Sequence, residues 1–121
     1  MSNPRTDDSG YYPDVAIRGN TFNRQYECKT LSGTPIDITG YIVRWRGVYG
    51  DVVIERTTED GSLTVTSPTT GVINLSLTPA ETRTIPDNDN MKYEMELVSP
   101  LNLQRTILWG DLTGRGGATL D

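Results

Sequence analysis

A period of two in side-chain polarity recurs along this chain and constrains its fold more than any other feature. It is cleanest over residues 91–97, where apolar and charged side chains alternate: Met91, Tyr93, Met95 and Leu97 against Lys92, Glu94 and Glu96. Successive side chains of a β-strand point to opposite faces, so the pattern predicts a strand with one buried and one solvated face. A helix would need apolar residues three or four positions apart.

The same alternation, interrupted by turn residues, predicts about eight short strands. They are expected at residues 14–17, 21–30, 41–46 and 52–57, around Leu63 and Val65, and at 73–77, 91–97 and 104–113. Residues 32–35 (Ser-Gly-Thr-Pro), 59–61 (Glu-Asp-Gly) and 99–102 (Ser-Pro-Leu-Asn) supply turns, and Gly47 to Asp51 is expected to be a loop or a hairpin turn. Three strands follow one another closely between residues 52 and 77, which predicts a meander.

The core strand is expected at residues 41–46. Tyr41, Val43 and Trp45 share one side of it, and Trp45 is its largest side chain. In the preceding strand Phe22, Tyr26 and Cys28 share the inner side. Arg24 also falls on that side, and we expect it near a strand end, where its head reaches water. Residues 107–109 (Ile-Leu-Trp) are apolar on both parities, so the last strand is predicted to be buried on both faces.

One short helix is predicted after Thr78. Thr78 is suited to the N-cap, Pro79 to the first helical position, and Glu81 completes a capping box. Pro86 follows too soon for more than one or two turns.

These elements predict an all-β protein, an antiparallel β-sandwich of the broad immunoglobulin-like class. Cys28 is the only cysteine, so the cysteine pair of an antibody-type domain is missing and the prediction concerns architecture alone. The expected organisation is a flexible N-terminal arm over residues 1–13, one β-sandwich domain over residues 14–113, and a flexible glycine-rich C-terminal tail over residues 114–121.

Composition argues against several functions. The net charge is −5 and the pI about 4.6, which disfavours nucleic acid as a partner. Arg44 and Arg46, with Arg18, Arg24 and Arg56, would form at most a local basic stripe, and we interpret them as solvated strand residues. The chain has no histidine, the commonest general base and metal ligand. Nothing resembles a signal peptide or a membrane span, so we expect a soluble protein made in a cytosol, without a membrane partner.

Five residues are candidates for interaction: Tyr11, Tyr12, Tyr49, Asp87 and Asp89. The adjacent tyrosines either anchor the arm to a neighbouring chain or cap the end of the sandwich, and the sequence favours neither. Residues 87–90 (Asp-Asn-Asp-Asn) carry the oxygen ligands of a calcium site but lack the pattern of an EF-hand loop, so turn chemistry is the preferred interpretation. No metal or cofactor is therefore predicted.

Other clusters are better explained by structure than by chemistry. The carboxylate pairs at residues 7–8, 59–60 and 94–96 have the composition of a glycosidase centre, but they fall in loops, in the arm or on an outward strand face. Tyr41, Trp45 and Tyr49 could form an aromatic platform for a sugar. Two of them share the core parity, so core packing is favoured.

Four motifs in order carry a family resemblance: residues 17–21 (Ile-Arg-Gly-Asn-Thr), 33–40 (Gly-Thr-Pro-Ile-Asp-Ile-Thr-Gly), 71–77 with Pro79 to Pro86, and 93–97 (Tyr-Glu-Met-Glu-Leu). Together they resemble a small β-sandwich domain of tailed-bacteriophage and prophage structural proteins, similar to the N-terminal domain of baseplate upper proteins. The resemblance covers about Val15 to Thr113. The turn at residues 87–90 departs from it, since a shorter glycine turn is expected there.

The resemblance implies a non-enzymatic virion component that acts by assembly, located in the virion and made in the bacterial host cytoplasm. In that family the sandwich commonly docks a fibre or receptor-binding module, whereas here we expect no such module after the glycine-rich tail. The position is therefore open among tail or baseplate, neck, fibre attachment and capsid decoration. Expected partners are other virion proteins, with many copies in a symmetric particle or a homo-oligomer. The alternative is a carbohydrate- or receptor-binding module that uses the loops at residues 47–51 and 86–90.

Overall fold

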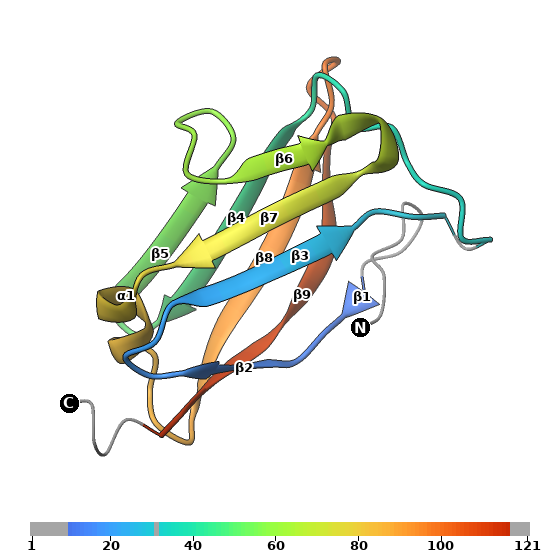
Figure 1. The fold of residues 1–121 in the computed structure, drawn as a ribbon. Helices are drawn as coiled ribbons and strands as arrows, with labels where there is room; N and C mark the ends of the chain where they lie inside the picture. The colour runs from blue at the N-terminus through green and yellow to red at the C-terminus, as the bar shows by residue number, and fades with distance from the viewer. Residues whose placement is uncertain (1–9, 31, 117–121) are drawn as a thin grey trace.

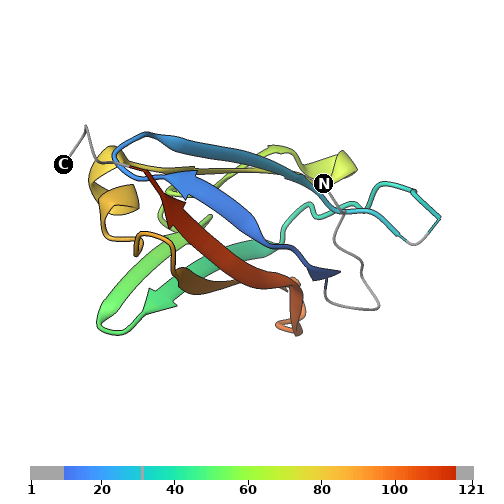
Figure 2. The ribbon, with the colours of Figure 1, turned by 90° about the horizontal axis from the view of Figure 1, so that it is seen from below.

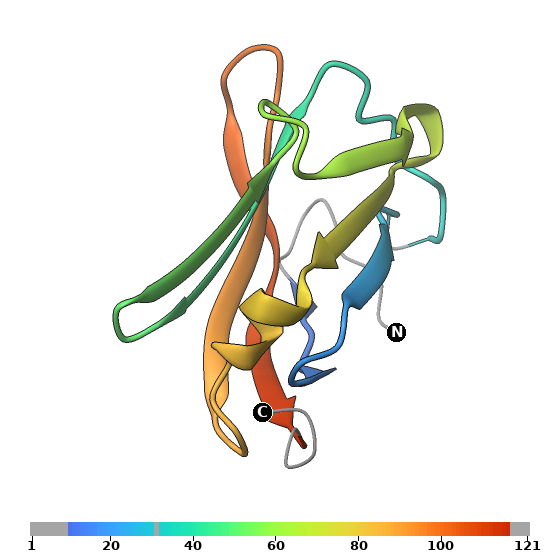
Figure 3. The same ribbon diagram turned by 60° about the vertical axis from the view of Figure 1, so that its left-hand side comes forward.

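The protein is a sandwich of two β-sheets in a computed structural model that describes residues 10–30 and 32–116. Sheet A contains six strands: β1 (Gly10–Tyr11), β2 (Asp14–Ile17), β4 (Ile42–Tyr49), β5 (Val52–Thr57), β8 (Asn90–Val98) and β9 (Gln104–Arg115). Sheet B contains three: β3 (Phe22–Glu27), β7 (Val72–Leu77) and β6 (Thr64–Ser67). Figures 1 and 3 show the two layers facing each other.

The strand order confirms the predicted all-β, immunoglobulin-like sandwich. Sheet A runs β1-β9-β8-β4-β5, with β2 also on β9, and sheet B runs β3-β7-β6. If β3 to β9 are named B, C, C′, D, E, F and G in chain order, the sheets become GFCC′ and BED, the grouping of immunoglobulin domains. Trp45 on β4 occupies the strand that carries the buried tryptophan of those domains, and it is 1% exposed.

Two strand pairings are parallel, although the other pairings between strands are antiparallel, as the sequence predicted. β1 and β2 both pair in parallel with β9, Tyr11 opposite Trp109 and Asp14 opposite Leu112. Figure 2 shows β2 between β9 and β3, on the side where the two sheets come together. The alternation of apolar and polar residues shows which face of a strand is buried. It does not show whether a neighbouring strand runs parallel or antiparallel, so the direction of these pairings could not be predicted from it.

The predicted meander over residues 52–77 is wrong. β5 is the edge of sheet A, and the chain then crosses to sheet B, where only β6 and β7 pair as neighbours in sequence. The Asp60-Gly61 turn therefore begins a crossover and does not close a hairpin. Leu63, only 2% exposed, lies in the core between the two sheets and anchors that crossover.

The core fills the space between the sheets as the alternation predicted. Val43 and Trp45 of β4 are buried, Tyr41 is half-buried, and the Trp45 ring stacks on Tyr93 with 5.8 Å between ring centroids. Cys28 is also buried, and burial raises the pKa of its thiol to about 11. The thiol therefore stays protonated at neutral pH and packs as a small apolar side chain.

A β-bulge explains the two apolar parities of β9. Met95 pairs with Leu108 and Glu96 with Thr106, so Ile107 is the extra residue. Ile107 and Leu108 consequently both point into the core at 1% exposure, whereas Trp109 is 45% exposed. The prediction that both faces of this strand are buried is wrong: a single face is buried, and the bulge shifts its register.

Arg24 lies in the middle of β3, not near a strand end as predicted. Its Nε donates to Oδ2 of Asp14 at 2.7 Å, and its Nη2 donates to Oδ1 at 2.8 Å. The guanidinium also lies 4.4 Å from the centre of the Phe22 ring. Asp14 belongs to β2, so this bidentate ion pair joins the two sheets where β2 lies between them.

The predicted helix is present as α1 (Pro79–Arg83), with the capping box in place. Thr78 Oγ1 accepts from the Glu81 N–H at 3.2 Å, and the Glu81 carboxylate accepts from the Thr78 N–H at 2.8 Å. A 3-10 turn, η1 (Pro68–Thr70), precedes β7. Among the described residues no helix is long and apolar enough to cross a membrane.

Several predicted boundaries shift. Of the two alternatives for residues 47–51, a loop or a hairpin turn, the structure has the hairpin turn, and it is confined to Gly50 and Asp51 because β4 continues to Tyr49. Gly47, inside β4, packs closely against Met91, because a Cβ at this position would lie 2.7 Å from Met91 Sδ.

The predicted boundaries of the domain also shift. β9 extends to Arg115, so the predicted tail does not begin at Gly114. β1 places residues 10 and 11 in sheet A, so the predicted arm does not reach Pro13. Residues 1–9 and 117–121 lie outside the described part of the chain.

Candidate functional site

An exposed aromatic pair stands out on the outer face of sheet A. Tyr11 on β1 lies opposite Trp109 on β9, and their ring centroids are 4.7 Å apart with the planes tilted by 55°. Tyr11 is 48% exposed and Trp109 45% exposed. Exposed aromatic rings that are held in place are typical of protein interfaces. Tyr11 was a candidate from sequence, whereas Trp109 was missed because the bulge at Ile107 was not visible there.

A carboxylate fixes the position of this aromatic pair. The Tyr11 hydroxyl donates to Oδ2 of Asp111 at 2.9 Å, and the Lys92 ammonium donates to Oδ1 of the same carboxylate. The hydrogen bonds from Lys92 and Tyr11 lower the pKa of Asp111, while the same contacts raise the pKa of Lys92 and of Tyr11. Tyr11 is thus held over β9 by stacking and by a charge-assisted hydrogen bond.

Tyr12 has a structural role, different from that of Tyr11. Its N–H donates to the Trp109 carbonyl at 2.9 Å, and its carbonyl accepts from the Tyr93 hydroxyl. Its side chain is half-buried against the core. Gly110 lies directly beneath, where an added Cβ would clash with the Tyr12 carbonyl. The two tyrosines therefore differ in role: Tyr12 anchors β1 to the domain, whereas Tyr11 presents its ring outward.

The remainder of this surface is a lattice of opposite charges, which we call the charged face. It comprises the outward side chains of β4, β5, β8 and β9 together with Tyr11: Arg44, Arg46, Glu55, Lys92, Glu94, Glu96, Trp109 and Asp111. Arg44 lies 3.3 Å from both Glu96 and Glu59, and Arg46 lies 3.8 Å from Glu55. Because positive and negative side chains alternate, this face is not a basic stripe. Arg46 is exposed, as the solvated interpretation predicted, whereas Arg24 and Arg56 are partly buried in ion pairs with Asp14 and Glu81, so that interpretation is wrong for these two.

Tyr49, the last residue of β4, meets Asp89, the residue before β8, and Asp87 lies two positions earlier in the same turn. The Tyr49 hydroxyl donates to Oδ2 of Asp89 at 3.2 Å, which raises the pKa of Tyr49. Asp87 forms an isolated bridge to Gly114, and the neighbouring Asn88 N–H donates to the Gly114 carbonyl at 2.8 Å. Turn contacts are present in this segment, since the Asp89 N–H donates to the Pro86 carbonyl and the Asn90 N–H donates to Oδ1 of Asp89 at 2.8 Å. Within the described ranges no group of three or more His, Cys, Asp or Glu side chains is placed to hold a metal ion.

Of the carboxylates considered for a glycosidase, Glu59, Asp60 and Glu96 are occupied by local contacts. Glu96 and Glu59 pair with Arg44, and Asp60 accepts hydrogen bonds from the backbone and hydroxyl of Ser62, which lowers its pKa. Residues 7 and 8 lie outside the described residues. Glu59, Asp60 and Glu96 therefore take part in turns and ion pairs of the surface.

Comparisons with known proteins assign no family to the chain. Neither a protein-family model nor a curated protein matches the sequence. Among solved structures, one match is a crystal structure described as a "putative glycoside hydrolase from Bacteroides vulgatus ATCC 8482", with 11% sequence identity and a TM-score of 0.44. The match covers 85% of this chain and 17% of that chain, so this chain spans a small part of that protein's length.

Proposed function

We propose that this protein is a non-enzymatic structural component of a tailed-bacteriophage virion, and that it works by assembly with other virion proteins. The observation that carries the assembly role is the exposed Tyr11–Trp109 pair, held in place on the charged face. The virion setting follows from the sequence motifs at residues 17–21, 33–40, 71–86 and 93–97, which resemble phage structural domains. The location within the virion stays open among the four sites named above.

The chemistry of the charged face supports a protein partner. Tryptophan and tyrosine are enriched among the residues that dominate binding energy, because they bury large areas at low entropic cost. Lys92 and Asp111 beside the pair, with Glu94 and Arg46 next to them, would form a polar rim around this aromatic centre. The interface is expected to centre on Trp109, with the charges setting orientation more than affinity.

The test is incorporation into particles. Virions or induced prophage particles should be purified from cells that express the full chain, and its copy number measured by mass spectrometry. The Trp109→Ala variant should be incorporated at least tenfold less, because a central aromatic contact is typically worth about 2 kcal/mol or more. Gln25→Ala, on the opposite side of the sandwich, is the matched control. Absence of the wild-type chain from particles, or equal incorporation of Trp109→Ala, would contradict the proposal.

The predicted arm needs a different test from the one its original bounds suggest. Deleting residues 1–13 would remove β1 and the Tyr12 contacts, so a loss of assembly would be confounded with a loss of stability. Deleting residues 1–9 leaves those contacts in place. If these residues act as an assembly arm, the shortened chain should stay folded and be depleted from particles. Normal incorporation of the shortened chain would contradict the arm hypothesis.

A second candidate function is a carbohydrate- or receptor-binding module at the loop end of the sandwich. It is favoured by the Tyr49–Asp89 hydrogen bond, which joins the end of β4 to the turn before β8. Binding on a glycan array that disappears in Tyr49→Ala would support it. Binding that is unchanged by Tyr49→Ala would exclude this end as the site.

A further inference from the structure

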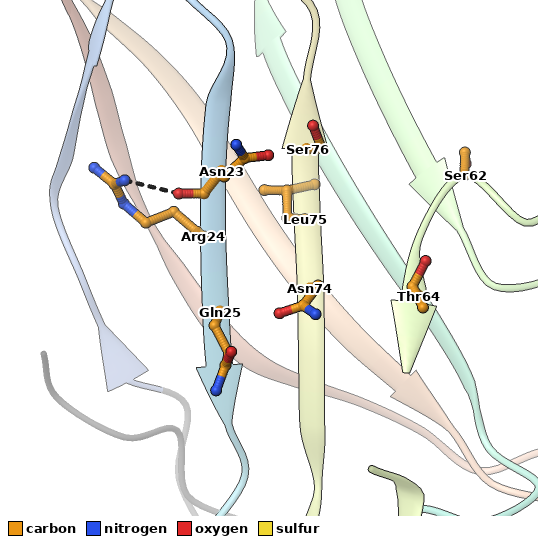
Figure 4. A pocket seen from close by; sticks show the side chains of 8 residues that line it. All are labelled: Asn23, Arg24, Gln25, Ser62, Thr64, Asn74, Leu75 and Ser76. Atoms are coloured by element: carbon orange, nitrogen blue, oxygen red, sulfur yellow. Dashed lines mark hydrogen bonds between the residues drawn. The ribbon is translucent and has the colours of Figure 1, made fainter. Parts of the chain in front are cut away.

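The outer face of sheet B presents a patch of uncharged hydrogen-bonding side chains, which we call the amide face. It consists of Asn23 and Gln25 on β3, Asn74 and Ser76 on β7, and Thr64 on β6 (Figure 4). Gln25 lies opposite Asn74, which lies opposite Thr64 on its other side, and Asn23 lies opposite Ser76. With Ser62, Arg24 and Leu75 these residues line an open recess of about 460 Å³.

The polar groups of the amide face are available for a ligand. Over residues 10–30 and 32–116, the side chains of Asn23, Gln25, Asn74, Ser76 and Thr64 make no hydrogen bond to the protein, although each can donate and accept. On the charged face, in contrast, Tyr11, Lys92, Asp111, Arg44 and Glu96 are bonded to one another. The amide face therefore offers donors and acceptors that the fold itself does not use.

The recess is also electrically neutral. Arg24 is the one charged residue in its lining, and its guanidinium is occupied: two of its nitrogens bond Asp14, and Nη1 donates to the Asn23 carbonyl at 2.9 Å. An anionic ligand would need an available cationic donor such as arginine or lysine. The lining supplies none, so the recess is suited to an uncharged ligand.

Two asparagines of the amide face are unfavourable for strand formation. Asparagine is depleted in β-strands, yet Asn74 occupies the middle of β7, the central strand of sheet B, and Asn23 lies within β3. No contact within the described fold compensates for this preference. Positions that break a local rule without a structural gain are expected at functional sites.

We propose that the amide face binds a neutral carbohydrate through hydrogen bonds to its hydroxyl groups. A sugar hydroxyl both donates and accepts, and each amide side chain offers a donor and an acceptor side by side. Neighbouring strands lie about 4.8 Å apart, and same-face residues along a strand about 6.7 Å apart, so the face is a regular grid of such groups. This site is separate from Tyr49 and Asp89, and it does not rest on the assembly proposal.

The affinity should be modest. No aromatic ring lines the recess, so the stacking that strengthens many sugar sites is missing and hydrogen bonds must carry the interaction. Each such bond replaces one to water, so it strengthens binding only about fivefold. We therefore expect a Kd of about 1 mM for an oligosaccharide.

The test is a titration of the full chain, followed by backbone amide NMR, with maltotriose, cellotriose, triacetylchitotriose and lactose. At about 10 mM sugar, a site with a Kd of about 1 mM is about nine-tenths occupied. At least one sugar should shift the signals of β3, β7 and β6 around Asn74. Asn74→Ala and Gln25→Ala should each weaken binding about fivefold for every hydrogen bond lost, while Glu94→Ala on the charged face leaves it unchanged.

Three results would overturn the proposal. The first is the absence of shifts with all of these sugars at about 10 mM, a level that reveals millimolar sites. The second is shifts centred on Tyr49 and Asp89, which would place the site at the loop end. The third is signals of the amide face that depend on protein concentration alone and lose that dependence in Asn74→Ala, which would make this face a contact between copies of the chain. Failure here leaves Trp109→Ala incorporation untouched, so the two proposals are distinguishable.

Discussion

The two outer faces of this sandwich differ in whether their polar side chains form hydrogen bonds and ion pairs with one another. On the charged face, carboxylates, amines and guanidinium groups bond to one another, and the Tyr11–Asp111–Lys92 contact holds an aromatic pair in place. On the amide face, neighbouring side chains share no hydrogen bond and carry no charge. Substitutions on the first face should therefore change stability and pH response, whereas substitutions on the second should change binding with little effect on stability.

The largest effect should come from Gly110→Ala. The added Cβ would collide with the Tyr12 carbonyl, so β1 must move away from β9 and Tyr11 must leave Trp109. We expect a loss of about 3 kcal/mol in the free energy of unfolding, measured by urea denaturation. Acrylamide quenching of the Trp109 fluorescence should rise, because the Tyr11 ring no longer covers it.

The matched control for Gly110→Ala is Ser76→Ala on the amide face. It removes an exposed hydroxyl that has no bond to the described protein, so the free energy of unfolding should change by no more than about 0.5 kcal/mol. If Gly110→Ala were as neutral as this control, β1 would not be a fixed part of sheet A, and the aromatic pair would lose its structural basis.

The next largest effect should come from the ion pair that joins the two sheets. Arg24→Met leaves the Asp14 carboxylate, whose side chain is 8% exposed, without its cation. The Val15 N–H still donates to Asp14 at 2.8 Å, so we expect a loss of about 2 kcal/mol, below that of a fully buried pair. In Arg24→Met with Asp14→Asn, urea denaturation should show part of this recovered. A loss within 0.5 kcal/mol for the single variant would rank the pair with ordinary surface ion pairs.

Much of this fold was readable from the sequence because alternation and capping act locally. Val52 to Thr57 and the Thr78 capping box were predicted at their observed positions, since side-chain parity and cap chemistry depend on neighbouring residues. Parallel pairing of β1 with β9 and the crossing after β5 depend on contacts distant in sequence, and no local signal specifies them. The candidate site was missed for a similar reason. Trp109 faces outward because of the bulge at Ile107, and no local signal in the sequence specified that bulge.

A smaller effect, dependent on pH, should be confined to the charged face. The contacts with Lys92 and Tyr11 place the pKa of folded Asp111 below its ordinary value of 3.8. A lowered folded pKa means that the stabilisation is complete above the unfolded pKa and fades as the pH falls through the folded value. The stability difference between wild type and Asp111→Asn should therefore be largest near neutral pH and shrink in acid.

Carboxylate-detected NMR should give the Asp111 pKa directly. Backbone signals around Gln25 and Asn74 should stay nearly constant over the same acid range, because the recess beside them contains no titrating carboxylate. Shifts there as large as those on β9 would show that the two faces are coupled through the core and would break the comparison. An Asp111 pKa above 3.8 would remove the proposed support of Tyr11.

The smallest effect distinguishes the two faces most directly, because its expected sign is opposite. Asn74→Thr places a residue with high strand preference at the centre of β7, and it removes no hydrogen bond to the described protein. Urea denaturation should show a gain of about 0.5 kcal/mol in the free energy of unfolding. A stability gain with weakened sugar binding would mean that Asn74 serves ligand binding and lowers the stability of sheet B. A loss of stability would instead show that Asn74 serves the fold, and the amide face would become an ordinary solvated surface.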